Sequence, residues 1–134
     1  MTLGEMLERS AEKYPDKLAI VFKERQVTFE ELNIGANKLG RALNELGIGA
    51  GDKVGIMMQN CPEFVVGVFA ALKAGAASVS INGALHGKEL TYMINHSDAK
   101  AIIATPPFDQ FLAMLRPKFP KIKHILTLDK EPEE

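Results

Sequence analysis

Apolar residues recur at spacings of three and four between Phe29 and Leu46, which is the period of an amphipathic helix. The apolar positions are Phe29, Leu32, Ala36, Leu39, Leu43 and Leu46. Thr28 and Glu31 form a T-x-x-E capping box, in which each side chain satisfies the other residue's backbone N–H. Gly47 follows, and glycine readily adopts the left-handed conformation that closes a helix. The pattern therefore predicts a helix between Thr28 and Gly47.

The rest of the chain divides into shorter apolar segments separated by polar, glycine or proline positions. Thr2 and Glu5 form a second capping box, and Pro15 ends the helix that it begins. The polar residues Lys23–Arg25 separate two short strands and predict a hairpin. The further predicted elements are helix Thr2–Lys13, strands Leu18–Phe22 and Gln26–Thr28, strand Lys53–Met58, helix Pro62–Ala74, strand Ala77–Ile81, helix Leu85–His96, strand Lys100–Ala104, helix Phe108–Phe119 and strand His124–Leu128.

Strands and helices alternate from Lys53 onward. This order predicts right-handed crossovers and a parallel sheet with helices on both faces. The expected fold class is therefore α/β, mainly a parallel sheet, with a small N-terminal hairpin. A chain of 134 residues has room for one domain, so we expect a single α/β unit over residues 1–134. Lys130–Glu134 is charged and is expected to be an exposed linker.

The segment Phe64–Ile81 is almost entirely apolar and imitates a membrane span, which needs about 20 apolar residues. Gly75 interrupts it, and small and β-branched residues follow that glycine. Length and glycine punctuation favour a buried helix, a glycine stop and a buried strand. We therefore expect no membrane span.

Composition limits the classes of function. Apolar residues make up 46% of the chain and charged residues 25%, which fits a globular protein rather than a disordered one. The net charge of −1 offers no basic face for nucleic acid. Cys61 is the single cysteine, so neither an intrachain disulfide nor a CxxC metal site can form. The N-terminal residues lack the pattern of a signal peptide, and the expected location is the cytoplasm.

The usual catalytic patterns do not fit the elements in which they occur. Gly47–Gly51 reads G-x-G-x-G, but it follows a helix and leads into a strand, whereas a phosphate-binding loop follows a strand and opens a helix. The histidines at His86, His96 and His124 form no HxxxH or HExxH pair. We therefore expect neither a catalytic residue nor a metal site in this sequence.

Polar residues and a glycine follow three of the predicted parallel strands. Ligands of parallel sheets bind outside the carboxyl ends of the strands. Gln59, Asn60, Asn82 and Thr105 can form hydrogen bonds there, and Gly83 would let the backbone approach a ligand. The alternative is that these side chains only cap the following helices or hold turns. The sequence leaves both interpretations open.

Several ordered segments resemble the adenylate-forming acyl-CoA synthetases. The segment SINGALHGKELTYMINHSDAKAIIA, from Ser80 to Ala104, resembles that family's PLNPRLTPEELAYILNDSGAKVVI. Earlier segments match the family's Thr-(aromatic)-x-Glu-Leu, Gly-Asp-x-Val, Asn-(Ser/Cys)-x-Glu and Lys-(Ala/Leu)-Gly-Ala patterns in order. These are Thr28–Leu32, Gly51–Val54, Asn60–Glu63 and Lys73–Ala76. The resemblance extends from about Leu3 to Leu128. Within the family, the sequence is similar to a long-chain fatty-acid–CoA ligase.

The resemblance implies a parent enzyme that uses ATP, Mg and CoA to convert a carboxylate into an acyl-adenylate and then an acyl-CoA. It also implies that this chain is the N-terminal part, because the family's Ser/Thr/Gly-rich phosphate loop, magnesium-binding glutamate and C-terminal lysine are not in these 134 residues. We therefore expect the chain alone to be inactive and to bind none of these cofactors tightly. Asn82, Gly83 and Thr105 are the implied candidates for contact with CoA.

This sequence departs from the family pattern at two neighbouring places. Gly83 stands where the family often has proline, in Ser80–Gly83 instead of Pro-Leu-Asn-Pro. His86 and Gly87 replace the usual Thr-Pro at a helix start. Threonine caps well and proline suits the first helical position, so a weaker helix start is expected here.

Two other functions fit the pattern of elements. The chain could be a stand-alone α/β binding or interaction module derived from the same family. A flavodoxin-like domain is disfavoured because Met58–Pro62 lacks the phosphate loop that it needs after the first parallel strand. The expected partner is the remainder of the parent ligase, and apolar faces intended for it predict self-association of the isolated chain.

Overall fold

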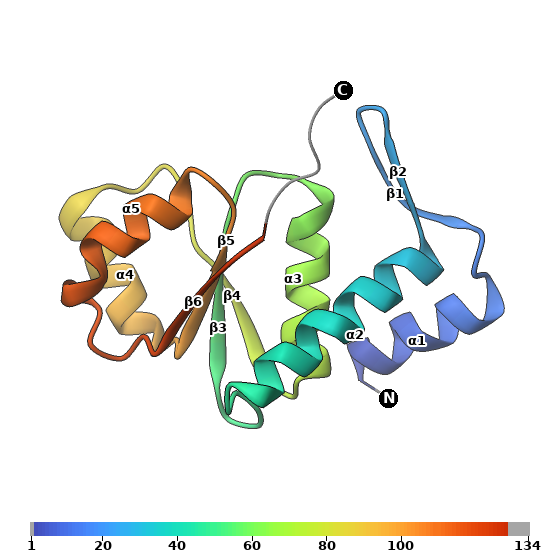
Figure 1. The fold of residues 1–134 in the computed structure, drawn as a ribbon, viewed down its shortest axis with the longest axis horizontal. Coiled ribbons are helices and arrows are strands. Elements are labelled where there is room, and N and C mark those ends of the chain that lie inside the picture. The colour runs from blue at the N-terminus through green and yellow to red at the C-terminus, as the bar shows by residue number, and fades with distance from the viewer. Residues whose placement is uncertain (1, 129–134) are drawn as a thin grey trace.

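The computed structural model describes residues 2–128, so the expected linker Lys130–Glu134 lies outside the described residues (Figure 1). The elements in chain order are α1 (Leu3–Lys13), β1 (Leu18–Phe22), β2 (Arg25–Thr28), α2 (Phe29–Glu45), β3 (Lys53–Met57), α3 (Pro62–Lys73), β4 (Ala77–Ser80), α4 (Gly87–Ser97), β5 (Ala101–Ala104), α5 (Phe108–Leu115), the 3-10 turn η1 (Arg116–Lys118) and β6 (His124–Thr127). The predicted order of helices and strands is confirmed.

Four strands form one parallel sheet in the order β4-β3-β5-β6, and β1 pairs with β2 in an antiparallel hairpin. Figure 1 shows α4 and α5 on one face of the sheet and α3 on the other, with α2 and α1 stacked outside α3. The predicted class, a parallel α/β sheet covered on both faces with an N-terminal hairpin, is confirmed.

The helix α2 follows the sequence pattern closely. Thr28 and Glu31 form the predicted capping box, with both reciprocal hydrogen bonds 3.1 Å long. The helix ends at Glu45, and Gly47 takes the left-handed conformation with φ of 85°. Ile48 then donates its N–H to the carbonyl of Leu43, which closes the last turn. Leu32, Ala36 and Leu43 of the apolar stripe are buried, whereas Leu46, just after the helix, is 38% exposed.

The nearly all-apolar helix α3 is buried from two sides, as its composition requires. One side packs on the sheet through Ala70 and Ala71, which are fully buried with Ile56. On the other side, Gly40 of α2 lies so close that a Cβ there would be 3.1 Å from the carbonyl oxygen of Ala70. Gly75 has φ of 91° and separates α3 from β4, which confirms the predicted glycine stop.

Two predicted helix boundaries were wrong by two residues or more. The expected helix Phe108–Phe119 ends at Leu115 and continues only as the 3-10 turn η1, which contains Pro117. Proline has no N–H and its ring clashes with the preceding turn of an α-helix. The helix expected from Leu85 begins instead at Gly87, and His86 makes no side-chain capping bond there. This uncapped start agrees with the expectation of a weaker helix start.

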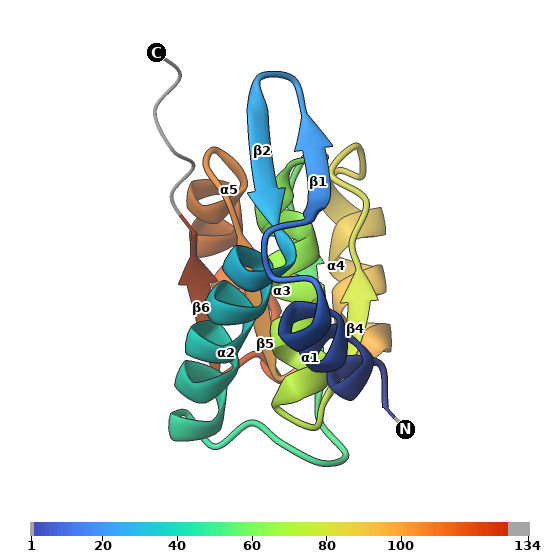
Figure 2. The same cartoon turned by 90° about the vertical axis from the view of Figure 1, so that its right-hand side faces the viewer.

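The β1–β2 hairpin projects on the same side of the molecule as the carboxyl ends of the sheet strands (Figures 1 and 2). Arg25 ties the hairpin to the start of α3, because its Nη1 lies 2.8 Å and 3.1 Å from the two carboxylate oxygens of Glu63. Lys23 in the turn has φ of 55°. Within residues 2–128, no helix is both long enough and apolar enough to cross a membrane.

Candidate functional site

The carboxyl edge of the sheet has a topological switch point between β3 and β5. These two strands are neighbours, but α3 leaves β3 toward one face and α5 leaves β5 toward the other (Figure 1). Diverging connections leave a crevice outside the strand ends, which is where ligands of such sheets bind. The segments that follow β3, β4 and β5 at this edge are Gln59–Cys61, Asn82–Ala84 and Thr105–Pro107.

Asn82 lies exposed at this edge, two residues after the end of β4. Its side-chain oxygen accepts a 2.9 Å hydrogen bond from the backbone N–H of Ala84. This is an Asx turn, in which the side chain substitutes for a backbone acceptor. Asn82 therefore holds the turn between β4 and α4, as the alternative sequence interpretation describes.

Gly83 is the half-buried centre of the same turn, and an aromatic ring fills the space beside it. A Cβ built at Gly83 would lie 2.8 Å from both Cε1 and Cζ of Phe108, the first residue of α5. Real side chains do not approach so closely, so the ring and a side chain at this position exclude each other. The space expected for a ligand beside this glycine contains the ring of Phe108.

Thr105 is fully buried at the end of β5. Its hydroxyl oxygen has no hydrogen-bond partner within the described part of the chain, although its carbonyl accepts a 2.9 Å bond from the N–H of Phe108. The peptide bond between Pro106 and Pro107 that follows is cis. An unpartnered buried hydroxyl is unfavourable by about 1–3 kcal/mol, so Thr105 is a position where a further polar group would be stabilising.

The strand end of β3 contributes exposed amides and a buried thiol. Gln59 and Asn60 are exposed, whereas Cys61 is 9% exposed and its sulfur lies 3.8 Å from that of Met58. Cys61 is thus a small, buried residue at the start of α3. The three segments therefore present Gln59, Asn60 and Asn82 to solvent but keep Thr105 inside.

Sequence reasoning missed a carboxylate near the same edge. Asp109, in the first turn of α5, is half buried, and its Oδ1 has no partner among the described residues. Its Oδ2 lies 3.5 Å from the hydroxyl of Thr127 at the end of β6. An acidic residue in the first turn of a helix after a strand was the available signal, although such residues are common because they suit the helix dipole.

The histidines lie apart, as their spacing indicates. His86 is exposed just before α4, His96 is exposed on α4, and His124 is half buried on β6. The ring of His96 stacks on that of Tyr92, with centroids 5.4 Å apart. Residues 2–128 contain no group of three or more metal-ligating side chains that could hold an ion.

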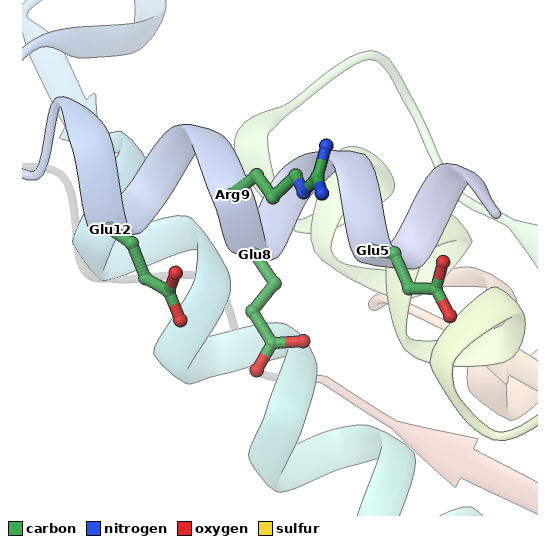
Figure 3. A pocket seen from close by; sticks show the side chains of 4 residues that line it. All are labelled: Glu5, Glu8, Arg9 and Glu12. Carbon is green, nitrogen blue, oxygen red and sulfur yellow. The ribbon is translucent and has the colours of Figure 1, made fainter. Parts of the chain in front are cut away.

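A shallow depression on α1 lies away from the strand ends. It is lined by Glu5, Glu8, Arg9 and Glu12, whose side chains project separately from the helix (Figure 3). Glu5 already accepts the hydrogen bond from the N–H of Thr2 that caps the helix. The depression is open to solvent, and we assign no chemistry to it.

Comparison with known proteins identifies the family. The family model "AMP-binding enzyme" matches residues 7–134. Tyrocidine synthase 2 of Brevibacillus parabrevis is 36% identical over 102 residues, which cover 76% of this chain and 3% of that protein. The medium/long-chain-fatty-acid–CoA/3-oxocholest-4-en-26-oate–CoA ligase of Mycobacterium marinum is 30% identical over 128 residues, which cover 96% of this chain and 23% of that protein.

Solved structures give the same result for the fold. The anthranilate CoA ligase AuaEII, in complex with anthranoyl-AMP, superposes with a TM-score of 0.88 at 29% identity. The superposition covers 96% of this chain and 25% of that one. The chain therefore spans a quarter or less of the length of these relatives. On the family match over nearly its full length, this chain belongs to the AMP-binding enzyme family.

Proposed function

We propose that this chain is the N-terminal α/β part, residues 1–134, of an ATP-dependent acid–CoA ligase. In the first half-reaction, a carboxylate oxygen attacks the α-phosphorus of ATP, and an acyl-adenylate forms as pyrophosphate leaves. In the second, the CoA thiol attacks the acyl carbon, and the acyl-CoA forms as AMP leaves. The observation that carries the proposal is the coverage of 96% of this chain by both a CoA ligase sequence and a CoA ligase structure.

The contribution of this chain would be structural. Both half-reactions develop negative charge that needs cationic groups and positioned donors. The strand ends offer amides and hydroxyls instead, and the described residues contain no cluster that could hold the Mg of the parent enzyme. We therefore expect ATP and Mg to be bound by other parts of the parent ligase and expect no ligase activity from this chain alone.

For CoA, the candidates remain Asn82, Gly83 and Thr105. Of the three, Asn82 is exposed, Gly83 is half buried and Thr105 is fully buried. Gly83 and Thr105 would act indirectly, since the first packs against a ring and the second is buried. The CoA-side proposal therefore predicts a direct contact by Asn82 and supporting roles for the other two.

The first test is the mass of the protein as its own cells make it. A ligase like the relatives above predicts a polypeptide about four times the 14.7 kDa of this chain, because the chain spans 23–25% of those proteins. A stand-alone module predicts 14.7 kDa. These outcomes are distinguished by probing a denaturing gel of a cell extract with an antibody against this chain. A band at 14.7 kDa would refute the proposal that the chain is part of a ligase.

The second test measures activity and binding. The intact protein, with ATP, Mg, CoA and a panel of fatty and aryl acids, should form an acyl-CoA and release AMP. CoA and ATP titrated separately into the 134-residue chain should give weak CoA binding and no ATP binding. Asn82→Ala should weaken the CoA interaction, whereas the matched control Asn60→Ala, an exposed asparagine at another strand end, should not. Equal effects of the two variants would contradict the role of Asn82.

A second candidate function is a segment of a large synthase. It is favoured by the 36% identity to tyrocidine synthase 2, which exceeds the identity to the CoA ligase, although it covers only 76% of this chain. The chain spans 3% of that synthase, so this candidate predicts a very large polypeptide on the same gel. It also predicts adenylate formation without transfer to free CoA.

We further infer that the isolated chain associates with itself and that the ligase works in the cytoplasm. Several large apolar side chains are exposed, including Leu3 at 58% and Met6 at 51% on α1 and Ile34 at 45% on α2. Exposed apolar surface favours association. Sedimentation should show a mass that rises with concentration, and a monomer at all concentrations would contradict this inference. The location rests on the single cysteine and is tested by cell fractionation.

A further inference from the structure

The ring of Phe108, rather than the backbone conformation of Gly83, excludes a larger residue at position 83. Four glycines of this chain have φ in the left-handed region, and Gly83 is not among them. Its backbone therefore does not require glycine. The obstacle to a larger residue is the ring, whose Cε1 and Cζ lie 2.8 Å from the position of a Cβ.

The same contact explains why glycine suits this position better than the proline of the family pattern that Ser80–Gly83 resembles, because proline carries a Cβ and a ring of its own. In this chain the space beside Gly83 is filled from outside the loop, by Phe108 at the start of α5. The ring belongs to the apolar layer between the sheet and the helices α4 and α5, together with Leu85 and Leu112. Gly83 and Phe108 are thus complementary in size.

The contact joins two loops that the sheet keeps apart. β4 and β5 are not neighbours, because β3 lies between them. The turn after β4 is shaped by local hydrogen bonds that Asn82 accepts from the N–H groups of Ala84 and Leu85. The start of α5 is bonded to the end of β5, because Phe108 donates its N–H to the Thr105 carbonyl. The ring of Phe108 connects these two local structures across the end of β3, at the edge where the switch point lies.

We propose that Phe108 is a positioning residue, which holds the Asn82–Ala84 turn in the place from which Asn82 contacts CoA. The proposal rests on the proposed ligase function for its ligand. Phe108 itself need not touch CoA, since it acts through the turn. Loosening the turn should weaken CoA binding equally in the ground state and the transition state, which raises the KM for CoA and leaves kcat unchanged.

The experiment is a two-residue cycle in the intact protein. Phe108→Leu removes the ring atoms that contact Gly83, and Gly83→Ala adds the Cβ that the ring excludes. Each single variant should raise the KM for CoA by about two- to tenfold, the lower part of the range of couplings between residues in contact, while kcat and the KM for ATP stay unchanged. The double variant should perform better than Gly83→Ala alone, because leucine leaves room for the new methyl group.

A matched control separates positioning from general stability. Phe111→Leu makes the same change on the same helix, at a half-buried ring of the same apolar layer. It should lower the thermal unfolding midpoint as Phe108→Leu does, but leave the KM for CoA unchanged. A rise in that KM by Phe111→Leu equal to that by Phe108→Leu would overturn the positioning role.

The remaining outcomes separate the pairing of Gly83 with Phe108 from the role of that pair in CoA binding. If the effects of Gly83→Ala and Phe108→Leu on the unfolding midpoint simply add, the two residues are not a matched pair and the proposal fails. If they do not add but the KM for CoA is unchanged, the pair exists and its positioning role is refuted. If the intact wild-type protein forms no CoA thioester, the proposed function and the CoA role both fall, and the unfolding cycle still decides the pairing.

Discussion

Removing the Arg25 side chain should detach the hairpin from the start of α3. Nη1 of Arg25 contacts both carboxylate oxygens of Glu63, at 2.8 Å and 3.1 Å. The side chains are 31% and 12% exposed, respectively, so the carboxylate is the more deeply buried partner. In Arg25→Ala, the partly buried side chain of Glu63 loses the guanidinium group that contacts both of its oxygens. We therefore expect the hairpin to separate before the sheet unfolds.

The expected cost follows from the degree of burial. Fully exposed ion pairs contribute about 0.2–1 kcal/mol, and breaking a fully buried pair costs about 3–5 kcal/mol. The pair between Arg25 and Glu63 lies between these limits, so its loss should cost about 1–3 kcal/mol. In a domain of this size that corresponds to a fall of about 3–12 °C in the unfolding midpoint.

The assay is a double-mutant cycle, which isolates the pair from other contacts of Arg25. Arg25→Ala, Glu63→Gln and the double variant are unfolded by heat and by urea, and the exposed neighbour Gln26→Ala serves as the control. The double variant should be less destabilised than the sum of the single variants. Strictly additive effects, or an equal loss in Gln26→Ala, would refute the reasoning that the ion pair anchors the hairpin.

Much of the fold could be predicted because local signals and burial agree in this chain. In α2 the apolar period, the Thr28–Glu31 box and Gly47 all specify the same helix, and the structure places each as expected. In α3 the absence of a polar face required cover on both sides, and the sheet and α2 supply it. Consistency of this kind across levels is what lets a sequence specify one structure.

The wrong boundary at α5 came from giving periodicity more weight than backbone chemistry. The apolar spacing continues through Leu115 to Phe119, and Phe119 is indeed 1% exposed. Pro117 prevents the α-helical hydrogen bond, so the chain reaches that buried position through a 3-10 turn instead. The core position was therefore predictable, whereas the backbone path to it depended on one residue.

The candidate site was only partly predictable, because its properties arise from packing between distant segments. The strand-end rule correctly brought Asn82, Gly83 and Thr105 to one edge. It did not indicate that the Thr105 side chain would be fully buried or that Phe108, 25 positions after Gly83, would fill the space beside that glycine. A sequence pattern shows which residues reach an edge, and the packing decides which of them a ligand can touch.

Further predictions test the core, the surface and the site. Gly55→Ala would place a Cβ 2.6 Å from Cδ1 of Ile81, so it should cost about 1–3 kcal/mol by overpacking, and Ile81→Val should recover part of this in urea unfolding. Lys121 hydrogen-bonds Asp98 and lowers the pKa of that carboxyl below its usual 3.8. A carboxyl group whose pKa is lower in the folded state stabilises the fold at pH values above its pKa in the unfolded state. This stabilisation is lost as the pH falls through the pKa of the folded state. The stability difference between wild type and Lys121→Ala should therefore shrink on acidification below pH 3.8, and a constant difference would contradict this. Thr105→Val keeps the shape of the side chain and removes a hydroxyl without a partner in the described residues. It should stabilise the protein by about 1–3 kcal/mol. A loss of stability in thermal unfolding would instead mean that the hydroxyl is hydrogen-bonded in solution. A loss confined to CoA titrations would mean that the hydroxyl supports CoA binding from its buried position.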